Sequence, residues 1–270
     1  MTAMPPERPR CALVMSAGTY VGPALCRQLA DRGHDLVVHA PRPDQVSDLV
    51  RRGVSVEVVD EEEVPLHGDG SVTTAEGCDL LVARALERFG RLDAAALSPL
   101  SLTPPGFTRG PFLEASVEDL DSLCGYFPST FHALRATVRA MQRQRAGQIL
   151  VFTSDAGGRP EAGWSLYGAV RAGQSFLVQA VALEHARDGI SINVLGSKNA
   201  VYEGFPGAPA GTVTDATATP GPWSAPLEAE TPLGRVGTME ELAAFAVVLL
   251  DGTNRFQTGQ YFSYSGGWNV

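Results

Sequence analysis

The segment ILVFTSDAGGRPEAGWSLYGAVR, residues 149–171, joins a short apolar run to the start of a helical pattern. Residues 149–152 are all apolar, which predicts a buried strand that leads into Ser154. Residues 167–186 predict a helix, so strand, loop and helix follow one another as in a βαβ unit. The same alternation continues on both sides of this segment. It indicates an α/β fold: a Rossmann-like, doubly wound parallel sheet with helices on both faces, in a single domain.

Apolar runs and helix-end residues predict the other elements. We expect strands at residues 11–15, 36–39, 54–59, 92–97, 191–195 and 260–264. We expect helices at residues 24–32, 76–89, 116–145 and 239–250. Ser116-Val-Glu-Asp119 is typical of a capping box, and Pro128 should kink or interrupt the helix that follows, because proline lacks a backbone N–H.

The loops at the carboxyl ends of the expected strands should form the ligand site, as in other open parallel sheets. These loops are residues 16–22, 98–110, 154–164 and 196–223. The last is rich in Gly, Pro, Ala and Thr, so we expect it to act as a mobile lid.

Length and composition limit the classes of protein to consider. The chain has 270 residues, 44% of them hydrophobic, and a net charge of −9, which favours a globular protein with a large core over nucleic-acid binding. No apolar run could span a membrane, and residues 1–10 lack the apolar core of a signal peptide. We therefore expect a cytoplasmic protein, with a disordered tail at residues 1–10 and a catalytic domain at residues 11–270. Four scattered cysteines predict buried free thiols.

Ser154, Tyr167 and Arg171 are the candidate catalytic residues. Tyr167 and Arg171 are four positions apart, so a helix would place them on one face, one turn apart. A permanent cation beside a phenol favours the phenolate form. A serine hydroxyl at the same place can donate to or accept from a substrate oxygen. The three residues predict a site that moves a proton to or from such an oxygen.

This spacing resembles the short-chain dehydrogenase/reductase family, and the resemblance runs from about residue 11 to residue 268. It is also carried by Phe89-Gly-Arg-Leu-Asp93, Pro232-Leu-Gly-Arg-Val-Gly237, Thr258-Gly-Gln260 and Gly266-Gly267. In that family the third catalytic residue is a lysine that also holds the cofactor ribose. The Ser-x12-Tyr-x3-Arg pattern of this chain resembles the halohydrin dehalogenases, a branch of the same fold.

The cofactor motifs of the dehydrogenases are altered in this chain. Their Thr-Gly-x3-Gly-x-Gly loop corresponds to residues 15–22, where Tyr20 replaces the glycine that lets the backbone approach a pyrophosphate. Ala40-Pro41 replaces the acid that binds the ribose, and Phe127 replaces the asparagine of the proton relay. An aromatic residue followed by Gly22 again resembles the halohydrin dehalogenases, although Met15 stands where their motif has threonine.

The resemblance implies dehalogenation of vicinal halohydrins to epoxides plus halide, without a cofactor or metal. Tyr167 would take the alcohol proton, and Ser154 would orient the oxygen. Tyr20, Gly22, Ser197 and Lys198 would bind the halide. In reverse, azide, cyanide or nitrite would open an epoxide.

Two other functions remain open. The chain could be an NAD(P)-dependent short-chain oxidoreductase with a divergent cofactor loop, which would bind a nicotinamide cofactor. It could also be a non-catalytic partner subunit, which would show no turnover. By analogy with the family we expect a homotetramer that assembles through the helices at residues 116–145 and 167–186.

Overall fold

The computed structural model describes residues 8–66, 71–98, 110–125, 127–202, 205 and 222–270. The tail predicted at residues 1–10 therefore lies mostly outside the described residues, and so does most of the lid predicted at residues 196–223. None of the described helices is long and apolar enough to cross a membrane.

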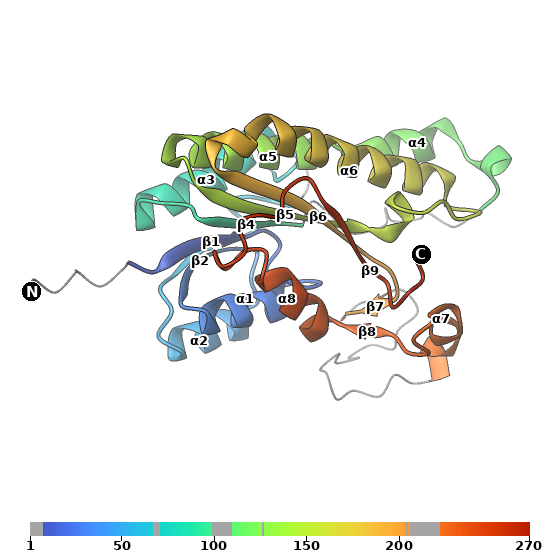
Figure 1. The fold of residues 1–270 in the computed structure, drawn as a ribbon, viewed down its shortest axis with the longest axis horizontal. Coiled ribbons are helices and arrows are strands. Elements are labelled where there is room, and N and C mark those ends of the chain that lie inside the picture. Colours follow the sequence, from blue (N-terminus) through green and yellow to red (C-terminus); the bar gives the residue numbers. More distant parts are fainter. Residues whose placement is uncertain (1–7, 67–70, 99–109, 126, 203–204, 206–221) are drawn as a thin grey trace, which may run out of the picture.

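A seven-stranded parallel sheet forms the centre of the molecule (Figure 1). Its strands are β1 (Arg10–Val14), β2 (His34–His39), β3 (Val56–Val59), β4 (Ala94–Leu97), β5 (Gly147–Ser154), β6 (Ile190–Ser197) and β9 (Tyr261–Tyr264). They lie in the order β3-β2-β1-β4-β5-β6-β9, which reverses direction between β1 and β4. This is the predicted doubly wound Rossmann-like fold, so the prediction of fold class is confirmed.

Helices cover both faces of the sheet (Figure 1). One layer contains α3 (Ala75–Phe89), α4 (Val117–Cys124), α5 (Phe127–Gln144) and α6 (Ser165–His185). The other contains α1 (Gly22–Asp31), α2 (Pro43–Arg51) and α8 (Met239–Val247). A short α7 (Ala225–Glu230) and a small two-stranded sheet of β7 (Ala200–Val201) and β8 (Gly237–Thr238) lie beside the carboxyl ends of β6 and β9.

Alternation along each strand separates the two halves of the core. In β5, Ile149 and Val151 pack into the cluster under α3, α5 and α6, whereas Leu150 and Phe152 pack into the cluster under α1 and α8. Successive side chains of a strand point to opposite faces, so a strand buried on both faces is apolar throughout. Burying a side chain such as Phe152 stabilises the fold by about 1.5–3 kcal/mol.

The helix-end signals are largely confirmed. Ser116 accepts from the Asp119 N–H at 3.0 Å and forms a capping box with it. Pro128 lies in the first turn of α5, and α4 ends at Cys124, so one expected helix is in fact two. Gly90 adopts the left-handed conformation that ends α3.

Several sequence predictions of local structure were wrong or incomplete. The first strand begins at Arg10, within the segment predicted to be a tail, because Arg10 pairs with His34 of β2. No prediction was made for α2, α7, β7 or β8, whose short segments carry little periodicity. Cys124 is exposed, whereas Cys11, Cys26 and Cys78 are buried as expected.

The β1–α1 loop is fixed by a buried histidine. His39 accepts from the Ser16 N–H through Nδ1 at 3.2 Å, and its Nε2 lies 2.8 Å from the Val64 carbonyl oxygen. Since Nδ1 accepts, Nε2 must carry the proton and donate to Val64. Burial lowers the pKa of His39, so the ring stays neutral and keeps both bonds.

We predict that His39→Gln makes the stability less dependent on pH between pH 7 and 5. The unfolded chain takes up a proton on His39 near pH 6.5, whereas the folded chain resists it because its pKa is lowered. The stabilisation is therefore complete above pH 6.5 and is lost as the pH falls, by up to about 1.4 kcal/mol per pH unit. Urea unfolding of wild type and variant at pH 5, 6 and 7 measures this slope. Equal slopes for both proteins would contradict the assignment to His39.

Candidate active site

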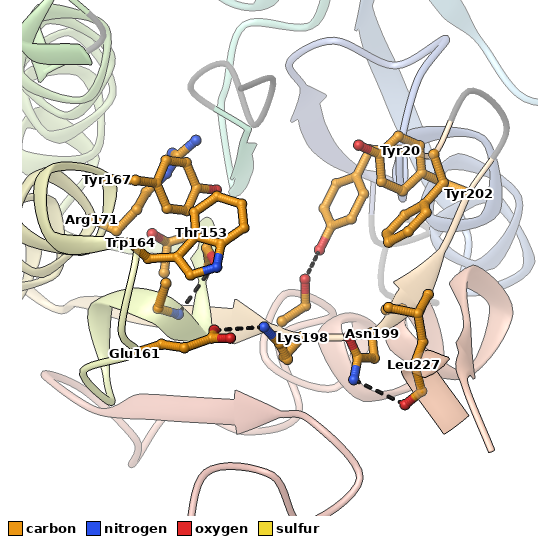
Figure 2. Close-up of a pocket in the computed structure, with 15 residues that line it drawn as sticks. Tyr20, Thr153, Glu161, Trp164, Tyr167, Arg171, Lys198, Asn199, Tyr202 and Leu227 are labelled. Atoms are coloured by element: carbon orange, nitrogen blue, oxygen red, sulfur yellow. Dashed lines mark hydrogen bonds and ion pairs between the residues drawn. The ribbon is translucent and has the colours of Figure 1, made fainter. Parts of the chain in front are cut away.

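A cavity of about 310 Å³ lies at the carboxyl ends of β5 and β6 (Figure 2). Ser154, Tyr167 and Arg171 all line it, so the structure brings the three predicted catalytic residues together. The other lining residues are Tyr20, Thr153, Ala156, Glu161, Trp164, Ser197, Lys198, Asn199, Ala200, Tyr202, Phe205 and Leu227.

Glycines bring the end of β5 against α6. A Cβ on Gly157 would lie 2.7 Å from the backbone carbon of Arg171, and one on Gly168 would lie 2.9 Å from the Ala156 oxygen. Only residues without a side chain allow this close approach. The turn that begins at Ser154 is therefore held directly against the first turns of the helix that carries Tyr167.

Ser154 closes β5 and begins the short turn at Asp155–Gly157. Its Oγ accepts from the Ala156 N–H at 3.3 Å, a weak cap, while the side chain also faces the cavity. Asp155, which is fully buried, accepts from the Tyr261 hydroxyl at 2.8 Å and also from the Ser263 hydroxyl. These bonds to β9 fix the backbone on which Ser154 stands.

Arg171 lies one helical turn after Tyr167, with its guanidinium carbon 5.0 Å from the centre of the Tyr167 ring. Arg171 is only 3% exposed. Its Nη1 donates to Gln174 Oε1 at 3.1 Å, and Gln174 Nε2 donates to Thr130 Oγ1 at 2.9 Å. A buried charge needs such partners, and they hold the guanidinium against the phenol.

Tyr20 reaches across the cavity from the β1–α1 loop. Its hydroxyl lies 2.7 Å from Ser197 Oγ, at the end of β6, and its ring packs edge-on against Phe152 and Tyr202. Burial raises the pKa of Tyr20, so it stays a neutral phenol. Figure 2 shows Tyr20 and Tyr167 on opposite sides of the cavity.

The backbone of this loop has a conformation suited to glycine. Ser16 and Tyr20 have φ values of 56° and 49°, in the left-handed region that costs a residue with a side chain about 1–3 kcal/mol. These two positions correspond to glycines of the dinucleotide loop in the family motif. The chain thus keeps the backbone path of that loop while adding a buried aromatic ring to it.

Only some of the other residues predicted to bind halide line the cavity. Ser197 and Lys198 line the cavity, but Gly22 does not: a Cβ there would lie 2.5 Å from the Ala17 oxygen, so it serves the close packing of α1. Lys198 Nζ lies 2.7 Å from Glu161 Oε2 and 4.6 Å from the centre of the Trp268 ring. Its charge is therefore balanced within the cavity wall (Figure 2).

Sequence reasoning missed Thr153 and Glu161. Thr153 is 6% exposed, and its hydroxyl has no hydrogen-bond partner among the described residues. Its place directly before Ser154, at the end of a buried strand, was the available signal. Glu161 carries no such signal, because its partner Lys198 is distant in the sequence.

The two ends of the β1–α1 loop differ in the room and the charge that they would offer a dinucleotide. A Cβ on Gly18 would lie 2.6 Å from the Ala40 oxygen and 3.3 Å from Arg42 Cγ, so Arg42 lies against the loop where the adenosine end of a dinucleotide binds. An arginine there accommodates the 2′-phosphate of NADP. At the nicotinamide end, the Tyr20 ring occupies the space between the loop and Ser197. Among the described residues, no cluster of His, Cys, Asp or Glu side chains could hold a metal ion.

Comparison with known proteins identifies the relatives. Residues 19–269 match the family model described as enoyl-(acyl carrier protein) reductase. A cyclohexanol dehydrogenase of Rhodococcus sp. (strain TK6) is 29% identical over 99% of this chain and 98% of its own. A 3-oxoacyl-[acyl-carrier-protein] reductase of Synechocystis sp. is 27% identical over 95% of each chain.

Solved structures show the same fold. YwfH, an NADPH-dependent reductase involved in bacilysin biosynthesis, superposes with a TM-score of 0.77 at 21% identity, over 96% of this chain and 98% of its own. A structure titled "Dehalogenation enzyme" has a TM-score of 0.75 at 22% identity, over 97% and 98%. At such identities the likeness concerns the fold alone.

The prediction of a cofactor-independent halohydrin dehalogenase was wrong, because the relatives that match the chain over nearly its full length are dehydrogenases and reductases. A serine and a tyrosine hydroxyl can bind a substrate oxygen in either chemistry, so Ser154 and Tyr167 do not distinguish the two. A cation four residues after the tyrosine lies beside it whether it is lysine or arginine. The chain belongs to the enoyl-(acyl carrier protein) reductase family of short-chain dehydrogenases/reductases.

Proposed function

We propose that this protein is an NAD(P)-dependent short-chain oxidoreductase that interconverts a small, largely apolar alcohol and its carbonyl compound. The observation that carries the proposal is the meeting of Ser154, Tyr167 and Arg171 in one cavity. The full-length relatives, a cyclohexanol dehydrogenase and a 3-oxoacyl reductase among them, support the same class of reaction.

Each of the three residues has a distinct role in this proposal. In reduction, the Tyr167 hydroxyl donates its proton to the substrate oxygen, and in oxidation it takes the proton back. Ser154 Oγ donates a hydrogen bond to that oxygen and orients it. Arg171 stabilises the phenolate that forms after proton donation, because its charge lies against the ring. General acid–base catalysis of this kind contributes about 10²–10⁴-fold.

The nicotinamide, when bound, supplies or accepts the hydride at the substrate carbon. Arg42 and the backbone of residues 16–22 are the residues that would hold the adenosine end, and an arginine favours NADP(H). For the nicotinamide end to enter, the Tyr20 ring must turn away from Ser197.

The walls of the cavity favour a compact apolar substrate. Trp164, Tyr202, Phe205 and Leu227 supply aromatic and aliphatic surface. A volume of about 310 Å³ is at the lower end of the range for small-molecule sites. A cyclic alcohol or ketone of six or so carbons suits both properties.

We also propose that a second copy of the chain covers the outer face of α5 and α6. Phe131, Phe176 and Leu183 are 45%, 75% and 75% exposed there. Large exposed apolar side chains on two neighbouring helices favour an interaction surface.

We predict that Phe176→Asp lowers the mass of the assembly in solution, because a buried unpaired carboxylate is costly at an interface. Light scattering after size-exclusion chromatography measures the mass. Leu113→Asp, at a side chain that is 93% exposed and lies outside these helices, is the control and should leave the mass unchanged. A wild-type protein that is already monomeric would contradict this proposal.

We predict that Tyr167→Phe lowers kcat/KM for NADP⁺-dependent oxidation of cyclohexanol by about 10²-fold or more, since the phenol proton carrier is lost. Absorbance of the reduced nicotinamide measures the rate. Tyr264→Phe removes a hydroxyl outside the cavity and should retain activity. A Tyr167→Phe variant with wild-type activity would exclude Tyr167 as the proton carrier.

We predict that Tyr20→Gly tightens NADPH binding about tenfold or more. The change opens the nicotinamide end and places glycine at a positive φ of 49°, where a side chain is strained. Titration calorimetry measures the Kd. Tyr20→Phe keeps the ring and should gain nothing. If neither wild type nor Tyr20→Gly binds NADPH or NADH, the oxidoreductase proposal is wrong.

A further inference from the structure

A second cavity, of about 410 Å³, lies at the opposite end of the sheet from the candidate active site. It is bordered by the start of β1, the turn into β5 at Gly147 and the start of β6 at Ile190. Because these strands are parallel, their amino ends meet here, while their carboxyl ends meet at Ser154 and Ser197 (Figure 1). The residues that line it are Arg10, Arg91, Asp93, Arg145, Ala146, Gly147, Gln148, Ala186, Gly189, Ile190, Ser191, Arg255 and Thr258.

Positive charge is concentrated in this cavity. Four of the described lining residues are arginines and one is a carboxylate, so the lining carries a formal charge of +3 (4 − 1 = 3). The whole chain has a net charge of −9, so this region has the opposite sign to the rest of the protein. Concentrated charge in a concave site raises the local concentration of ions of the other sign.

The arginines are held in place by hydrogen bonds to neutral groups as well as by carboxylates. Arg10 Nη2 donates to Gln148 Oε1 at 2.6 Å, and Arg255 Nε donates to the Gly252 carbonyl oxygen at 2.9 Å. Arg91 Nε lies 2.6 Å from Asp93 Oδ2, an oxygen that also accepts from the Cys11 N–H at 2.9 Å.

Arg145 has a neutral and an acidic partner. Its Nη2 donates to the Arg187 carbonyl oxygen at 3.1 Å, and its Nη1 lies 3.9 Å from Asp188 Oδ1. Asp188 also accepts from Gln142 and contacts His185. The carboxylates around the cavity are therefore shared with other donors.

The arginines repel one another within the cavity. Burial lowers the pKa of Arg10; Asp93 opposes this effect, and the charges of Arg255 and Arg91 add to it. Like charges held close together cost free energy unless a counter-charge binds between them.

The backbone of Arg145 has a conformation that is costly for an arginine. It follows α5 with a φ of 55°, in the left-handed conformation for which glycine is preferred at the end of a helix. A left-handed residue with a side chain costs about 1–3 kcal/mol. Arg145 is also 71% exposed in its side chain, so packing does not account for the choice of arginine.

We propose that this cavity binds a small multivalent oxyanion of the pyrophosphate or phosphate-ester class. Guanidinium groups match phosphate oxygens with pairs of parallel N–H donors, and Ser191 also lines the cavity. The cavity is larger than a single phosphate requires. None of the described lining residues is aromatic, so the wall offers no ring on which a nucleobase would stack.

Binding joins segments that are distant in the chain: Arg10, the α5–β5 turn and the segment around Arg255. A ligand that binds the folded state alone stabilises it by RT ln(1 + [L]/Kd). The site should therefore be detectable by thermal unfolding, independently of catalytic activity and of the nicotinamide cofactor.

The test is a titration of wild-type protein with pyrophosphate at constant ionic strength, with the melting temperature as the readout. We expect a saturable increase, and a weaker apparent affinity for inorganic phosphate. Arg145→Gly should weaken the apparent affinity at least tenfold, while the protein without ligand melts at the same or a higher temperature, because glycine relieves the left-handed strain. Arg255→Ala should weaken the affinity as well. Arg143→Ala, an exposed arginine of α5 outside the cavity, is the matched control and should behave as wild type.

Three outcomes would overturn the proposal. The first is the absence of any increase with pyrophosphate. The second is an equal increase with sodium chloride at the same ionic strength, which would indicate general screening. The third is an unchanged pyrophosphate affinity in Arg145→Gly and Arg255→Ala, which would place the anion elsewhere, for example beside Arg171 or Lys198 in the catalytic cavity.

Discussion

The close contact between the turn after β5 and helix α6 is the constraint on which the site depends. Gly157 lies against the backbone of Arg171, and Gly168 lies against the Ala156 carbonyl group. A side chain at either glycine would push the turn and the helix apart, and Ser154 would move away from Tyr167. The buried Asp155 supports the same turn from the other side through Tyr261 and Ser263. The relative placement of Ser154 and Tyr167 is thus set by backbone packing.

The second constraint is the bridge from Tyr20 to Ser197, which links the ends of β1 and β6 across the face of the sheet. The Tyr20 ring fills the space beside the β1–α1 loop. The backbone of this loop still follows the path of a dinucleotide-binding loop, with left-handed residues at positions 16 and 20. Arg42 at the other end of the loop remains suited to a phosphate. If the chain binds a nicotinamide cofactor as proposed, the Tyr20 ring is a barrier to it, and the free energy needed to move this ring should set the affinity.

Charge is divided between the two ends of the sheet. At the carboxyl ends, Lys198 is paired with Glu161 and Arg171 is buried against Tyr167, so the cavity around them is lined mainly by aromatic and aliphatic groups. At the amino ends, Arg10, Arg145 and Arg255 surround an open cavity with less acidic compensation. An apolar alcohol or ketone suits the first environment and an oxyanion suits the second.

Local sequence pattern is sufficient to predict the fold class, the capping box at Ser116, the break before Pro128 and the meeting of Tyr167 with Arg171. The capping box and the break follow from residue types that are close in the chain, and Tyr167 meets Arg171 because residues four apart on a helix are neighbours in any fold. The pattern did not determine the reaction, since the same spacing serves two chemistries, and the dehalogenase prediction made from it was wrong. The contact of Tyr20 with Ser197, the pairing of Lys198 with Glu161 and the shared cavity of Arg10 and Arg255 become visible in the folded protein alone. Such partners are far apart in the chain, and strand order in the sheet, which local pattern does not encode, brings them together.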